Sequence, residues 1–146
     1  MMALKPGHRI AIDYGEKWIG IAMSDSSGLI ASPVGTIAAT DLEEELLKIS
    51  EQNSISTIYV GLPIHLSGDE GLSAAKARAL AGRINLLNIA PVRLVDERLS
   101  TSSATSDKSL IAKFGIDALA AVEILKFALD GERSQEQPFG SQLDDR

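Results

Sequence analysis

The stretch that decides the fold is HRIAIDYGEKWIGIAM, residues 8–23. Its first part, His8–Tyr14, alternates apolar and polar side chains as a β-strand does, and Trp18–Met23 follows as a second strand. Gly15 lies between the two, and the short spacing predicts a hairpin. Asp13 stands near the end of the first strand, where a carboxylate in an apolar run is costly unless it is paired or binds a metal.

Strands and helices alternate along the rest of the chain. The expected elements are an interrupted edge strand at 29–37, a helix from Asp41, a strand at 57–62, a helix at 72–87, a strand at 92–95, a helix at 101–114 and a helix at 116–129 that Gly131 ends. This order predicts an α/β fold in which helices cover a mixed sheet. Helical crossovers make the strands at 57–62 and 92–95 parallel to the first strand, so their carboxyl ends share one edge of the sheet. Ligands bind at that edge in open α/β sheets.

The composition is that of a single soluble globular domain. The chain has 146 residues, of which 45% are hydrophobic and 23% charged. The absence of cysteine excludes disulfides, thiolate metal sites and cysteine nucleophiles. Neither a signal peptide nor an apolar run of the ~20 residues that cross a bilayer is visible. We therefore expect a cytoplasmic protein with no membrane partner.

Acidic residues give the chain a net charge of −6, which by itself disfavours a nucleic-acid partner. The excess is concentrated in residues 41–51 and 130–146, which indicates a solvated helix face and an acidic tail. A local basic surface elsewhere is therefore compatible with the composition. We expect one domain over residues 1–130 and a disordered tail over 131–146.

Acidic residues also mark the expected binding edge: Asp13 and the pair Asp96-Glu97 at strand ends, and Asp117 at a helix start. Because side chains alternate along a strand, only one of Asp96 and Glu97 can face the same site as Asp13. Clustered carboxylates without Cys or His suit Mg²⁺ or Mn²⁺, and two such ions ~4 Å apart can act together on a phosphodiester. Each acid also has a structural interpretation: Asp117 could begin its helix, and Asp96 or Glu97 could pair with Arg98.

Four segments of the sequence resemble the motifs of the YqgF family, the Holliday-junction-resolvase-like proteins described as pre-16S rRNA nucleases. In this chain they are DYGEK with IGIA from residue 13, VGLP with SGDEG from residue 60, DERLST from residue 96, and IDALAA from residue 116. They occur in the family's order and extend over residues 8–130. Together they are far more specific than the D-x-G turn alone.

The resemblance implies an RNase H-like fold with a five-stranded mixed sheet, the first three strands antiparallel and the others parallel. It implies a metal-dependent nuclease in which Asp13, Glu97 and Asp117 are catalytic and bind one or two Mg²⁺ or Mn²⁺ ions. The expected role is processing of the 5′ end of pre-16S rRNA in ribosome biogenesis. The alternatives are a Holliday junction resolvase acting on DNA and a non-catalytic ribosome-assembly factor. The partner is then structured RNA or branched DNA, and the protein a monomer or a homodimer.

Candidate phosphate contacts flank these acids: Gly15 and Lys17 in the first motif, and Arg98 and Thr101 in the third. Arg98 could instead orient Asp96. Two features depart from the family pattern. Trp18 stands where the family commonly has arginine; if exposed it could stack a base, and otherwise it packs in the strand. The segment at 101–117 is short and has Lys108 and Lys113 as its only bases.

Overall fold

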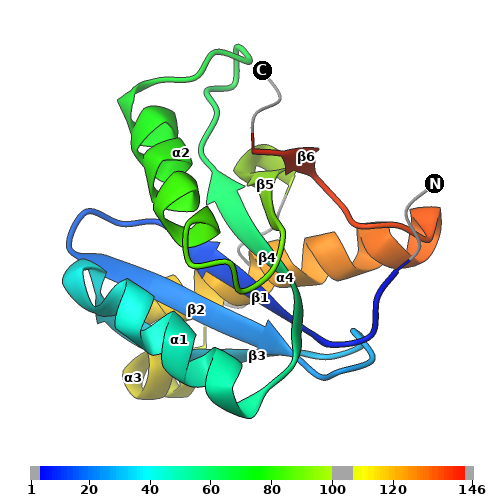
Figure 1. The fold of residues 1–146 in the computed structure, drawn as a ribbon. Helices are drawn as coiled ribbons and strands as arrows, with labels where there is room; N and C mark the ends of the chain where they lie inside the picture. Colours follow the sequence, from blue (N-terminus) through cyan, green and yellow to red (C-terminus); the bar gives the residue numbers. More distant parts are fainter. Residues whose placement is uncertain (1–3, 100–106, 144–146) are drawn as a thin grey trace.

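One six-stranded mixed sheet forms the centre of the molecule in the computed structural model, which describes residues 4–99 and 107–143 (Figure 1). The strands lie in the order β3-β2-β1-β4-β5-β6. Their bounds are β1 His8–Asp13, β2 Trp18–Ser24, β3 Ala31–Ala38, β4 Ile55–Leu62, β5 Val92–Asp96 and β6 Ser141–Gln142. The first three are antiparallel neighbours, β4 and β5 run parallel to β1, and β6 is antiparallel to β5. The predicted mixed α/β sheet is confirmed, but five strands was wrong because β6 adds a sixth.

Helices cover both faces of this sheet (Figure 1). Buried side chains of α1 (Leu42–Gln52) and α2 (Leu72–Asn85) pack on one face together with Ile10 and Ile12 of β1. The long helix α4 (Ile116–Gln135) packs on the other face, against Ala11 and Ala22. Both faces of β1 are therefore buried, as is usual for a strand inside an α/β sheet.

The predicted helix at 101–114 is described only in part. Its described portion is α3, Lys108–Phe114, and Asp107 caps it by accepting hydrogen bonds from the backbone N–H groups of Ser109 (3.0 Å) and Leu110 (3.2 Å). Residues 100–106 lie outside the described part of the chain. No helix within the described residues is long and apolar enough to cross a membrane.

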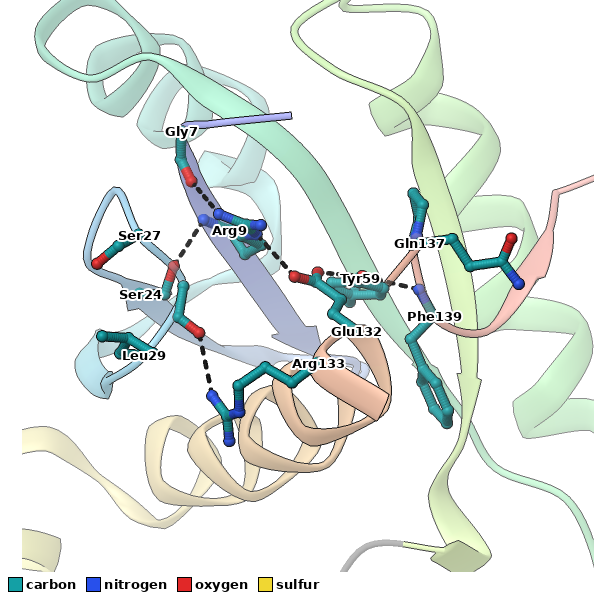
Figure 2. Close-up of polar contacts among 12 residues, drawn as sticks. Gly7, Arg9, Ser24, Ser27, Leu29, Tyr59, Glu132, Arg133, Gln137 and Phe139 are labelled. Atoms are coloured by element: carbon teal, nitrogen blue, oxygen red, sulfur yellow. Dashed lines mark hydrogen bonds and ion pairs between the residues drawn. The ribbon is translucent and has the colours of Figure 1, made fainter. Parts of the chain in front are cut away.

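The last helix does not end at Gly131. It continues to Gln135 because Glu132 is buried and bound on both sides: Arg9 Nε donates to its Oε1 at 3.0 Å, and the hydroxyl of Tyr59 donates to its Oε2 (Figure 2). Glu136 then ends the helix in the left-handed conformation, φ 55°. An ion pair anchored deep in the sheet thus outweighs the weak helix propensity of one glycine.

Residues 131–143 are not the disordered tail that the sequence predicted, because they continue α4 to Gln135 and form β6 beside β5. The Phe139 backbone N–H donates to the Tyr59 hydroxyl at 3.1 Å, and Arg93 donates to the carbonyls of Phe139 and Gly140, the latter at 2.6 Å. These bonds hold the chain along β5, where β6 pairs. The acidic composition of this segment predicted a tail because the strand that β6 pairs with, β5, lies far away in the sequence.

Candidate active site

Three acidic residues meet where β1, β5 and α4 come together. Asp13 is the last residue of β1, Glu97 follows β5 directly, and Asp117 is the second residue of α4. Since β1 and β5 are both parallel to β4, their carboxyl ends lie at the same edge of the sheet, as the sequence predicted.

The carboxyl groups of Asp13 and Glu97 are hydrogen-bonded to each other. Burial raises the pKa of Asp13 to about 8, and the neighbouring Glu97 and then the charge of Asp117 act in the same direction. The pKa of Glu97 is also raised, chiefly by burial and further by the charge of Asp96, although its bond with Asp13 opposes the shift. Two carboxylates in contact cannot both ionise cheaply, so Asp13 keeps a proton and donates it to Glu97.

Two glycines make room for these acids. A Cβ atom on Gly20, which lies opposite Asp13 in the sheet, would stand 1.9 Å from the backbone oxygen of Asp117. A Cβ atom on Gly61 of β4 would stand 2.5 Å from Oε1 of Glu97. The first turn of α4 can therefore rest directly on β2, and the Glu97 side chain crosses β4 to reach Asp13. Gly20 was not singled out from the sequence, although a glycine inside an apolar strand is a signal of close approach.

Asp96 belongs to a separate ion pair. The guanidinium of Arg98 donates to both of its carboxylate oxygens, at 2.7 Å in the shortest contact, and this lowers the pKa of Asp96. A further bond joins Arg98 Nη1 to the backbone oxygen of His65 at 3.3 Å. Of the two roles considered for Arg98, the structure shows the internal pair, and Glu97 is the residue that reaches Asp13.

Of the remaining candidate phosphate contacts, two lie in the turn that follows Asp13 and one cannot be placed. Gly15 lies in the turn between β1 and β2, where a Cβ atom would stand 2.2 Å from the carbonyl oxygen of Trp18, so the turn requires glycine. Lys17 is exposed in the same turn, and its carbonyl accepts a hydrogen bond from the backbone of Ala39. Thr101 lies outside the described residues.

The donor set suits a hard divalent cation, because Asp13 and Glu97 offer oxygen ligands whose mutual repulsion such an ion would offset. Over residues 4–99 and 107–143, no three His, Asp or Glu side chains are arranged to hold an ion as they stand. Asp13 and Glu97 thus form the contact pair of a candidate site, and Asp117 acts on it through its charge.

Comparisons with known proteins agree with this architecture. A family model described as "RuvX: Holliday junction resolvase" matches residues 7–131. The chain is 37% identical over 142 residues to a "Putative pre-16S rRNA nuclease" of Streptomyces avermitilis, covering 90% of this chain and 91% of that protein. It is 42% identical over 144 residues to the protein of the same name from Nocardioides sp., covering 90% and 92%.

A solved structure shares the fold. The chain titled "T. thermophilus RuvC in complex with Holliday junction substrate" superimposes with a TM-score of 0.56, covering 90% of this chain and 99% of that one. At 13% identity this likeness concerns the fold, which is RNase H-like as expected. The family itself is shown by the sequence comparisons. The family model matches most of the chain, and the two relatives are more than 35% identical along nearly their whole length. This chain belongs to the RuvX family, which is the YqgF family whose four motifs its sequence resembles.

Proposed function

We propose that this chain is a metal-dependent nuclease that hydrolyses phosphodiester bonds in the RNA precursor of 16S rRNA, at its 5′ end. The observation that carries the proposal is the Asp13–Glu97 carboxyl pair beside Asp117, at the sheet edge where ligands bind in this class of fold. The names of the 36–42% identical relatives supply the substrate. Such a role also belongs in the cytoplasm.

Asp13 and Glu97 would hold a divalent ion, Mg²⁺ or Mn²⁺, with Asp117 as the third acid. When bound, one or two such ions lower the pKa of water and stabilise the charge that develops on the leaving oxygen. To bind the ion Asp13 must release the proton that it shares with Glu97, so binding is coupled to proton release at neutral pH. Asp96, the first acid of the motif, is instead paired with Arg98.

The direct test is cleavage of a transcript that spans the 5′ end of mature 16S rRNA. Wild-type protein with Mg²⁺ should cut it, EDTA should stop the reaction, and Asp13→Asn should lose at least ~100-fold in kcat, more than a change in a residue that only supports a ligand. The matched control is Asp130→Asn, because Asp130 is an exposed aspartate on α4 more than three helical turns after Asp117. Activity that survives both EDTA and Asp13→Asn would refute the proposal.

A second candidate function is resolution of four-way DNA junctions, which the description of the family model and the RuvC likeness favour. A resolvase cuts two strands related by symmetry and therefore works as a homodimer. A four-way DNA junction in the same assay, with the oligomeric state measured by sedimentation, separates the two functions. RNA binding without cleavage of either substrate would instead indicate a non-catalytic assembly factor.

A further inference from the structure

Trp18 lies at the rim of the candidate active site. It is the first residue of β2 and stands two positions before Gly20, on whose face the first turn of α4 rests. Its neighbour Ile19 is completely buried on the opposite face, among the side chains that pack with α1 and α2. Alternation along the strand therefore places the indole on the α4 face, and the Cα atom of Trp18 lies ~7 Å along β2 from that of Gly20, the residue that pairs with Asp13.

The indole is exposed, although tryptophan is on average one of the more buried residues. Trp18 retains 56% of its accessible surface, and Ile116, which directly precedes Asp117, retains 54%. Two large apolar side chains are thus exposed to solvent near the acids, one on β2, which pairs with the strand of Asp13, and one on α4, which carries Asp117. The packed alternative for Trp18 that the sequence left open is not the one observed.

Three cations on the neighbouring elements are engaged by carboxylates, whereas Lys17 stays exposed in the turn before Trp18. Lys76 is paired with Glu16, Arg78 with Glu70 at 2.6 Å, and Arg98 with Asp96 at 2.7 Å. A phosphate that took any of these cations would have to displace a carboxylate. With a net charge of −6 over the whole chain, binding of a polyanion needs a contribution that does not depend on charge.

We propose that Trp18 stacks on an unpaired base of the substrate RNA close to the scissile phosphate. This inference rests on the proposed function, because it places the RNA backbone at the acids. The short backbone spacing between Trp18 and Gly20, which pairs with Asp13, keeps the stacked base close to the acids. Stacking of a base on an aromatic side chain contributes ~1–3 kcal/mol and needs a base that is free of a duplex. The enzyme therefore selects RNA that is single-stranded or splayed at the cut.

Fluorescence offers a direct measurement, because Trp18 is the only tryptophan in the chain. The Asp13→Asn protein, which binds without cutting, is titrated with an unstructured RNA oligonucleotide and with a perfect duplex of equal length. The unstructured RNA should quench the emission strongly and the duplex weakly. In parallel, by a label on the RNA, Trp18→Ala should raise the Kd for the unstructured RNA ~5- to 150-fold and leave that for the duplex unchanged.

Two further variants keep the test decisive. Trp18→Phe retains an aromatic face and should recover most of the affinity, whereas Leu86→Ala removes an exposed apolar side chain at the far end of α2 and should change nothing. Equal quenching by duplex and unstructured RNA, or an unchanged Kd in Trp18→Ala, would overturn the inference even if the wild type cleaves RNA. A change in emission with protein concentration alone would assign the residue to self-association and overturn it too. Quenching and weakened binding without cleavage would support the inference while the proposed function fails.

Discussion

Replacing Asp13 with asparagine should stabilise the metal-free protein while it destroys the site. The pKa of Asp13 is raised from its ordinary 3.8 to about 8. Below pH 4 the carboxyl is protonated in both the folded and the unfolded chain, so the fold suffers no penalty. Between about pH 4 and pH 8 the unfolded chain releases a proton that the folded chain keeps, and stability falls as the pH rises.

The size of this penalty follows from the shift. Each unit corresponds to ~1.4 kcal/mol, so at pH 7 the free energy of unfolding is lower by at most about 4 kcal/mol than it would be with a neutral side chain at this position. Asparagine has nearly the same shape and can still donate to Glu97. We therefore expect metal-free Asp13→Asn at pH 7 to be about 2–4 kcal/mol more stable than the wild type, which raises Tm by roughly 5–15 °C.

In the presence of Mg²⁺ the wild type should gain stability relative to Asp13→Asn. An ion that binds the folded wild type stabilises it by about 2.7 kcal/mol at a hundred times Kd, whereas the variant, lacking a ligand, should gain little. The assay is thermal unfolding followed by circular dichroism from pH 4 to pH 8, in EDTA and in millimolar Mg²⁺. Asp130→Asn, an exposed change of the same chemistry, should follow the wild type to within ~1 kcal/mol throughout. If metal-free Asp13→Asn is less stable than the wild type at pH 7, or if both lose stability equally between pH 4 and pH 8, the reasoning about this carboxyl pair is refuted.

Three other changes probe different parts of the structure. Glu97→Gln should lower kcat at least ~100-fold, because Glu97 contacts Asp13. Asp96→Asn should lower kcat less than tenfold, because the Asp96 carboxylate is paired with Arg98 instead. Equal losses of kcat in the two variants would contradict this assignment of the two acids. Glu132→Gln leaves Arg9 buried without its counter-charge and should cost ~3–5 kcal/mol in urea unfolding, with activity intact under native conditions. Gly20→Ala pushes a methyl group into the backbone of α4 and should cost ~1–3 kcal/mol together with most of the activity; a fully active variant would show that α4 need not rest on β2.

Local patterns in the sequence were sufficient for strands β1 to β5 and for the acids that follow β1 and β5. Alternation over His8–Tyr14 and the glycine after Asp13 predict a strand that ends in a carboxylate, and the helical crossovers make the strand before Glu97 parallel to it. These inferences need only near neighbours and general rules of chain geometry. Residues that are distant in the sequence therefore do not enter into these inferences.

Choices that depend on distant residues were decided by the tertiary structure alone. Glu97 rather than Asp96 reaches Asp13 because of the register of β5 beside β4 and because Gly61, having no side chain, leaves room for the Glu97 side chain to cross β4. The extra turn of α4 depends on Glu132, whose partners stand 73 and 123 positions earlier in the chain. A buried charge is stable only where its counter-charge and hydrogen bonds converge in space, and no window of adjacent residues contains that information.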